Sequence, residues 1–81
     1  MDVWIVLTED RHADTEAAPF STEEGAVTAA WAEARECAVS PDEVEQAELT
    51  QDMRESGWVL YLPYGTEGDC VRVVKRRMDE S

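Results

Sequence analysis

The sequence predicts an α+β domain in which a long helix packs on one face of a four-stranded, mainly antiparallel sheet. Two β-rich segments lie at each end of the chain, and the segments between them carry helix signals. The expected order is β-hairpin, long helix, short helix, β-hairpin. A chain of 81 residues is long enough for one domain with a small core. We assign it to residues 1–78 and expect 79–81 to be a frayed tail.

The first hairpin is expected over residues 3–20. Residues 3–8 are β-branched and aromatic, which suits a strand. A polar turn follows, and residues 15–20 return as a second strand, where Pro19 suits an edge or a strand end. The single histidine, His12, lies in this turn among acidic residues, but the spacing matches no calcium loop. We therefore expect no metal site.

A long helix is expected over about residues 22–38. Ser21 stands three residues before Glu24, which is the spacing of a capping box. Apolar residues then recur at helical spacing and form one stripe. We expect Trp31 to pack beneath the sheet together with its neighbours on this stripe. The stripe consists of Val27, Ala30, Trp31, Ala34, Cys37 and Ala38.

The middle of the chain is less regular. Residues 44–49 show neither a helical stripe nor a strand alternation, which leaves a helical turn, a short strand or an ordered loop as alternatives. Thr50 and Gly57 are suitable cap residues for a short helix over about 51–56. A strand over 58–64, a glycine-bearing loop and a returning strand over 70–77 complete the second hairpin.

Both long strands are apolar on two faces, whereas a single helix covers only one face of a sheet. If residues 41–56 pack on the opposite face, the monomer buries both faces. If they pack beside the long helix, an apolar patch stays open and is expected to bind a second copy, as a homodimer, or another protein. The residues expected on this patch are Trp4, Val6, Val59 and Tyr61.

The charge distribution is strongly acidic, with a formal net charge of -12 at pH 7. Such a charge opposes direct binding to DNA or RNA, because it repels phosphates. It either maintains solubility, including at high salt, or docks on a basic protein surface. The acidic residues expected to contact a partner are Asp42, Glu43, Glu45, Glu48, Asp52 and Glu55.

Sequence signals for catalysis are weak. Cys37 and Cys70 have no CxxC spacing, and no nucleophile elbow or phosphate-binding loop is present. We therefore expect no enzyme activity, no cofactor and no metal. The sequence has no basic, apolar leader and no apolar run long enough to span a membrane, so we expect a cytoplasmic protein without membrane contact.

These patterns favour a small, non-catalytic, acidic protein-binding module that regulates or inhibits a partner protein by occupying its surface. The alternative is an inhibitor of a DNA- or RNA-handling protein that imitates nucleic acid, of the anti-restriction or anti-CRISPR type. The two hypotheses share a basic partner surface and differ in whether the partner's own nucleic acid competes for it.

Overall fold

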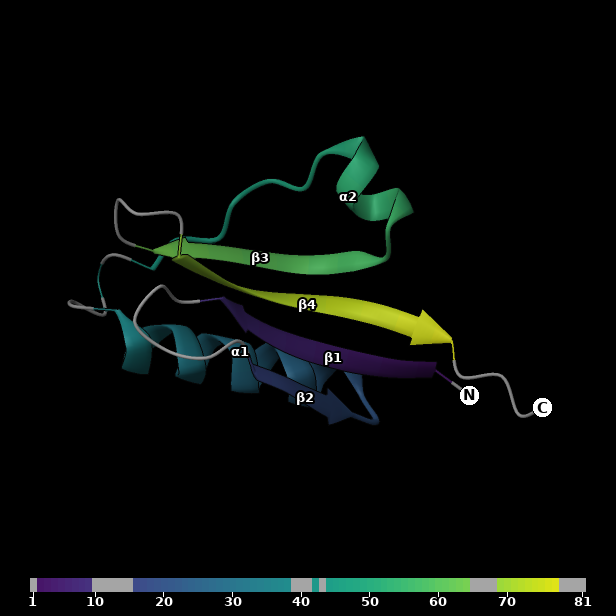
Figure 1. Cartoon of the computed structure of the whole chain (residues 1–81), viewed down its shortest axis with the longest axis horizontal. Coiled ribbons are helices and arrows are strands. Elements are labelled where there is room, and N and C mark those ends of the chain that lie inside the picture. The colour runs from purple at the N-terminus through teal and green to yellow at the C-terminus, as the bar shows by residue number, and fades with distance from the viewer. Residues whose placement is uncertain (1, 10–15, 39–41, 43, 65–68, 78–81) are drawn as a thin grey trace.

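The computed structural model describes residues 2–9, 16–38, 42, 44–64 and 69–77. It confirms the α+β fold: one antiparallel sheet with the strand order β2-β1-β4-β3, a helix packed on it and a second, short helix (Figure 1). The strands are β1 (Asp2–Glu9), β2 (Glu16–Phe20), β3 (Trp58–Tyr64) and β4 (Asp69–Arg77), and the helices are α1 (Glu23–Cys37) and α2 (Gln51–Glu55).

The two hairpins join through their long strands. β1 pairs antiparallel with β4 over the whole length of β1, from Asp2 opposite Arg77 to Glu9 opposite Cys70. The first and last strands of the chain therefore form the centre of the sheet, and β2 and β3 form its edges. Each edge strand contains a proline, Pro19 in β2 and Pro63 in β3, as expected for strands that have one unpaired side.

α1 begins one residue later than the capping-box pattern predicts. Thr22, not Ser21, is the N-cap: its backbone is extended, and its hydroxyl accepts a hydrogen bond from the Gly25 N–H at 3.1 Å. Small residues form the side of α1 that faces the sheet: Ala26, Ala30 and Ala34 are fully buried there. Alanine lets the helix backbone approach the strands closely.

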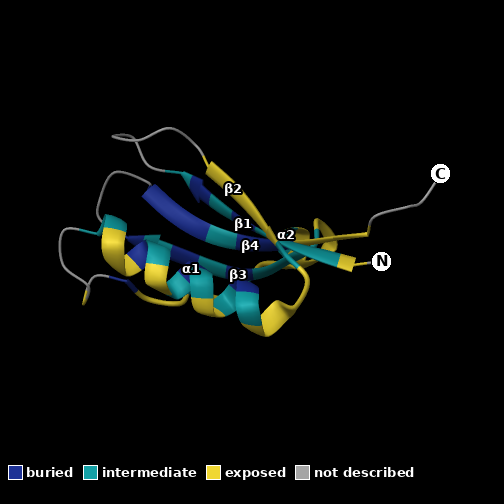
Figure 2. Ribbon diagram, turned by 90° about the horizontal axis from the view of Figure 1, so that it is seen from below, coloured by how far each residue is buried: buried dark blue, intermediate teal, exposed yellow. Residues whose placement is uncertain are grey.

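Trp31 lies at the margin of this alanine stripe. It is half-buried and packs against the core from the side, while the Arg35 guanidinium carbon lies 5.2 Å from its ring centroid. The outward side of α1 is mostly exposed (Figure 2). The expected contact of Trp31 with the core is present, but alanines, rather than the tryptophan, occupy the centre of the helix–sheet interface.

The hydrophobic core lies between α1 and the sheet. Val73 and Val71 of β4 and Leu62 of β3 are fully buried there, and Val44 joins them from the segment before α2. Val6 and Thr8 of β1 lie on the same face, because they pair with Val73 and Val71 of β4. The core therefore uses every second residue of each strand, as the pleat requires.

The opposite face of the sheet, here called the outer face, carries the alternate residues. Ile5 pairs with Val74, and Leu7 pairs with Arg72, which in turn faces Tyr61. The register shifts between Trp58 and Leu60. This irregularity places Trp58 on the outer face beside Tyr61, although a regular alternation would put the two residues on opposite faces.

Residues 44–50 follow the edge of β3 and do not cover the outer face (Figure 1). The Ala47 N–H donates a hydrogen bond to the Tyr61 carbonyl at 3.0 Å. Thr50 then caps α2, where its hydroxyl accepts from the Met53 N–H at 3.2 Å, and Gly57 makes the turn into β3 with φ 91°. The described part of this segment therefore lies neither across the opposite face of the sheet nor beside α1. It follows the edge of the sheet at β3.

Candidate protein-interaction surface

The outer face is an apolar and aromatic surface that no described helix covers. α1 contacts the other face, and α2 contacts β3 at the edge. Val74 and Cys70, on the central strand β4, are buried by their neighbours, whereas Ile5 and Leu7 on β1 remain half-exposed. The further apolar members of the outer face are Val3, Trp58, Tyr61 and Pro63.

Arg72 lies in the middle of this surface. Its guanidinium carbon is 4.7 Å from the centroid of the Trp58 ring, and its Nη2 is 2.7 Å from Oε1 of Glu9. The Trp58 ring meets Tyr61 edge to face, with the centroids 5.5 Å apart and the rings at 65°. Rings and cations held in this way present a large contact area that loses little entropy on binding.

Several exposed carboxylates, here called the acidic edge, lie on and just before the segment that follows the edge of β3 and on α2. Its members are exposed, and none forms an ion pair with a described residue; Glu55 accepts a hydrogen bond from Gln51 Nε2 at 3.1 Å. The sixth acidic residue expected here, Glu43, lies outside the described residues. The acidic edge consists of Asp42, Glu45, Glu48, Asp52 and Glu55.

The apolar residues expected to form one patch are not on one surface. Val6 is only 4% exposed and lies beneath α1. Trp4 shares its face, with the Lys75 Nζ 5.6 Å from its ring centroid, and Val59 packs against the same core. Tyr61 is the one of the four on the outer face.

The residues that replace them were partly visible in the sequence. Ile5 and Leu7 follow directly from the two-residue alternation of β1, once the helix-facing side is known. The position of Trp58 does not follow, because it depends on the register shift in β3. The structure therefore corrects which side of the first strand remains uncovered and adds Trp58 and Arg72 to the candidate surface.

Three of the four basic residues of β4 contact neighbouring polar or acidic groups. Besides the Arg72–Glu9 pair, Lys75 Nζ lies 3.6 Å from Oδ2 of Asp2, and Arg76 Nη1 donates to the Ser56 carbonyl at 2.7 Å. Cross-strand pairs of opposite charge, such as Arg72–Glu9 and Lys75–Asp2, stabilise neighbouring antiparallel strands. In the acidic edge, by contrast, no carboxylate forms an ion pair with a described cation, although Arg54 lies between Asp52 and Glu55 in α2.

Cys70 is a buried thiol of β4, and Cys37 lies half-buried at the end of α1. Burial, reinforced by the nearby Glu9 carboxylate, raises the pKa of the Cys70 thiol, so the nucleophilic thiolate is disfavoured. Cys37 and Cys70 form no disulfide. The described part of the chain holds no cluster of three potential metal ligands, and none of its helices is long and apolar enough to cross a membrane.

Comparison with known proteins gives no relative: no family model, no curated protein and no solved structure matches the chain. The candidate interaction surface consists of the outer face and the acidic edge, which lie next to each other at β3.

Proposed function

We propose that the protein is a non-catalytic binding module that occupies the surface of a basic partner protein. One observation carries the proposal: the stacked Trp58, Tyr61 and Arg72 side chains lie beside several exposed carboxylates without described ion-pair partners. An apolar, aromatic centre with a charged border is the usual anatomy of a protein–protein interface.

The two parts have different roles in this proposal. Burial of the Trp58 and Tyr61 rings supplies most of the affinity, because large aromatic side chains release water and lose few rotamers. The acidic edge accelerates the encounter and orients the partner. A suitable partner surface has an apolar centre with lysine or arginine residues on the flank that meets β3.

The test begins with affinity capture of a partner from host extract, followed by measurement of its dissociation constant at low and at moderate salt. The variant Glu45→Gln/Glu48→Gln removes two charges from the acidic edge. Its matched control, Glu24→Gln/Glu36→Gln, removes the same charge from exposed positions on α1. We expect the first variant to bind more weakly than the control, and its affinity to depend less on salt.

Trp58→Ala tests the outer face in the same assay. A tryptophan at the centre of an interface is worth roughly 2 kcal/mol or more, which corresponds to about a thirty-fold loss of affinity. Equal affinities for wild type, Trp58→Ala and both charge variants would refute the proposed surface. Displacement of the protein by the partner's own DNA or RNA would identify the partner's nucleic-acid site as the place that it occupies.

A further inference from the structure

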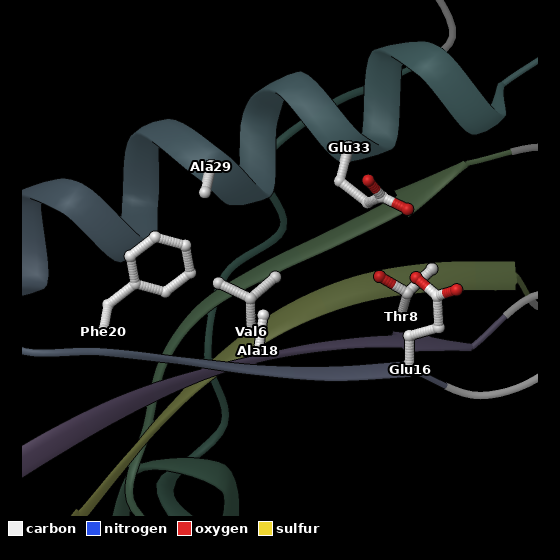
Figure 3. A pocket seen from close by; sticks show the side chains of 7 residues that line it. All are labelled: Val6, Thr8, Glu16, Ala18, Phe20, Ala29 and Glu33. Carbon is white, nitrogen blue, oxygen red and sulfur yellow. The ribbon is translucent and has the colours of Figure 1, made fainter.

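A separate recess lies on the other side of the sheet, between α1 and β2. Its volume is about 180 Å³, smaller than the roughly 300–1,000 Å³ of pockets for drug-sized ligands, so it suits one short chain. One end is apolar and the other is polar (Figure 3). The apolar end is lined by Val6, Ala18, Phe20 and Ala29, and the polar end by Thr8, Glu16 and Glu33.

The polar end brings together three separate elements. Glu33 points from α1 toward Thr8 of β1 and Glu16 of β2, which are paired in the sheet (Figure 3). Neither glutamate forms an ion pair with a described residue; Glu33 Oε1 accepts from the Cys37 Sγ at 3.5 Å. Two carboxylates therefore face the same small volume without a described cation between them.

Thr8 provides an independent indication of a ligand. The residue is only 5% exposed, and its side chain points into the recess (Figure 3). Its hydroxyl forms no hydrogen bond with any other described side chain or backbone group. The oxygen opens onto the recess and is not one of the fully buried atoms that lack a partner, so it can accept a hydrogen bond from a bound donor.

We propose that the recess binds a free primary amine on a short, linear alkyl chain, independently of the protein-binding role. An ammonium group has three N–H donors, and the recess offers three side chains with acceptor oxygens: Thr8, Glu16 and Glu33. The alkyl chain then lies against Val6 and Phe20, where it is removed from water.

Other ligand classes fit the recess less well. Calcium takes six to eight oxygen ligands, whereas more than half of the residues lining the recess are apolar. An anion would face two carboxylates. A neutral alcohol could bond to Thr8 but would gain no charge attraction from Glu16 and Glu33, so the recess favours a ligand with both a positive charge and an alkyl chain.

The test is an NMR titration of the ¹⁵N-labelled protein with n-pentylammonium chloride. We expect saturable shifts of the Val6, Ala18 and Ala29 amide signals. At the same concentrations, n-pentanol supplies the chain without the charge, and ammonium chloride supplies the charge without the chain. Both are expected to cause smaller shifts at these residues. Non-saturable shifts, or equal shifts with n-pentanol, would overturn the proposal.

Variants assign the binding to the named residues. Glu16→Gln/Glu33→Gln should weaken binding of n-pentylammonium by about ten-fold or more, because two charge-assisted hydrogen bonds become neutral ones. Glu24→Gln/Glu36→Gln changes the net charge equally, away from the recess, and should leave the affinity within about two-fold of wild type. If both variants lowered the affinity for n-pentylammonium equally, the net charge of the protein would explain the binding, and the proposed site would be refuted.

Two further measurements test the apolar end of the recess and the identity of the ligand. Ala29→Leu fills the apolar end and should abolish the saturable shifts, while an otherwise unchanged spectrum shows that the fold is retained; undiminished binding would contradict the assignment. A blocked peptide with a single lysine is the competing occupant. If it binds the recess more tightly than n-pentylammonium, the ligand is a lysine side chain of a protein, and the assignment to a free amine is wrong.

Discussion

Arg72 stacks on Trp58 across β4 and β3, with its guanidinium carbon 4.7 Å from the ring centroid. The same guanidinium contacts the Glu9 carboxylate of β1 at 2.7 Å, so one side chain ties three strands together on a face that has no helix over it. The stack therefore stabilises the outer face and also sets its shape for a partner.

Arg72→Met tests this stabilising role. Methionine retains most of the apolar stem but removes the cation, so the stacking on Trp58 is lost and Glu9 becomes unpaired. We expect a loss of roughly 1–2 kcal/mol in the free energy of unfolding, measured by chemical denaturation. Arg77→Met removes the same charge from an exposed strand end and is expected to have little effect. Equal losses would show that net charge, rather than stacking, is responsible.

Gly57→Ala should destabilise the junction between α2 and β3. The backbone of Gly57 has φ 91°, and an added Cβ would lie 2.7 Å from the carbonyl oxygen of Lys75. Backbone strain of this kind costs about 1–3 kcal/mol, which should appear as a lower thermal midpoint. Gly25→Ala is the comparison: Gly25 has no positive φ, and its Cβ would crowd only the Thr22 hydroxyl that caps α1, so its loss should be the smaller one; a larger loss there would contradict the argument.

The alanine stripe of α1 should tolerate no enlargement. Ala30 is fully buried against the sheet, and Ala30→Leu is expected to cost about 1–3 kcal/mol through overpacking. Ala32→Leu makes the same change at an exposed position of the same helix and should be nearly neutral. The measurement is the denaturation midpoint of each variant. Identical midpoints would show that α1 does not turn Ala30 toward the sheet.

Trp31→Ala should destabilise the protein less than the same substitution of a fully buried tryptophan would. Because Trp31 is half-buried at the margin of the core, we expect a cost of about 2 kcal/mol, below the 3–5 kcal/mol typical of core sites. Chemical denaturation measures this difference directly. A loss at the upper end of that range would mean that the tryptophan, and not the alanine stripe, carries the packing of α1.

Stability should fall at alkaline pH because of Cys70. Burial raises the pKa of this thiol above the ordinary value of 9.0, so the folded state holds its proton to higher pH than the unfolded state does. The stabilisation is complete below the unfolded-state pKa and is lost as the pH rises through the folded-state pKa. Cys70→Ala should flatten this alkaline decline in the unfolding free energy, whereas Cys37→Ala should leave it unchanged.

The local elements could be predicted from the sequence because their signals are local. Thr50 and Gly57 delimit α2 through cap chemistry, and the range of β3 follows from its run of apolar residues. The position of residues 44–50 depends instead on one backbone hydrogen bond, from Ala47 to Tyr61, and on burial of Val44. Such long-range contacts leave no periodic pattern in the chain.

The candidate surface was harder to predict for the same reason. The acidic residues could be read from the sequence, because residues that are close together in one short segment also lie close together in the fold. The apolar face required knowledge of which side of β1 meets α1, and both sides carry large apolar residues. The register shift near Trp58 then reversed one further assignment, because a single extra residue moves a side chain to the opposite face.

The proline in each outer strand has a consequence for the behaviour of the protein at high concentration. Tyr61 directs its carbonyl away from β4 toward Ala47, and Pro63, two residues later, shares that orientation but has no N–H to donate. β2 is short and contains Pro19. Interrupted edges and a net charge of -12 oppose the strand-by-strand growth that leads to fibrils. These features act against association through the strand edges, and they do so beside a sheet face that is apolar and uncovered.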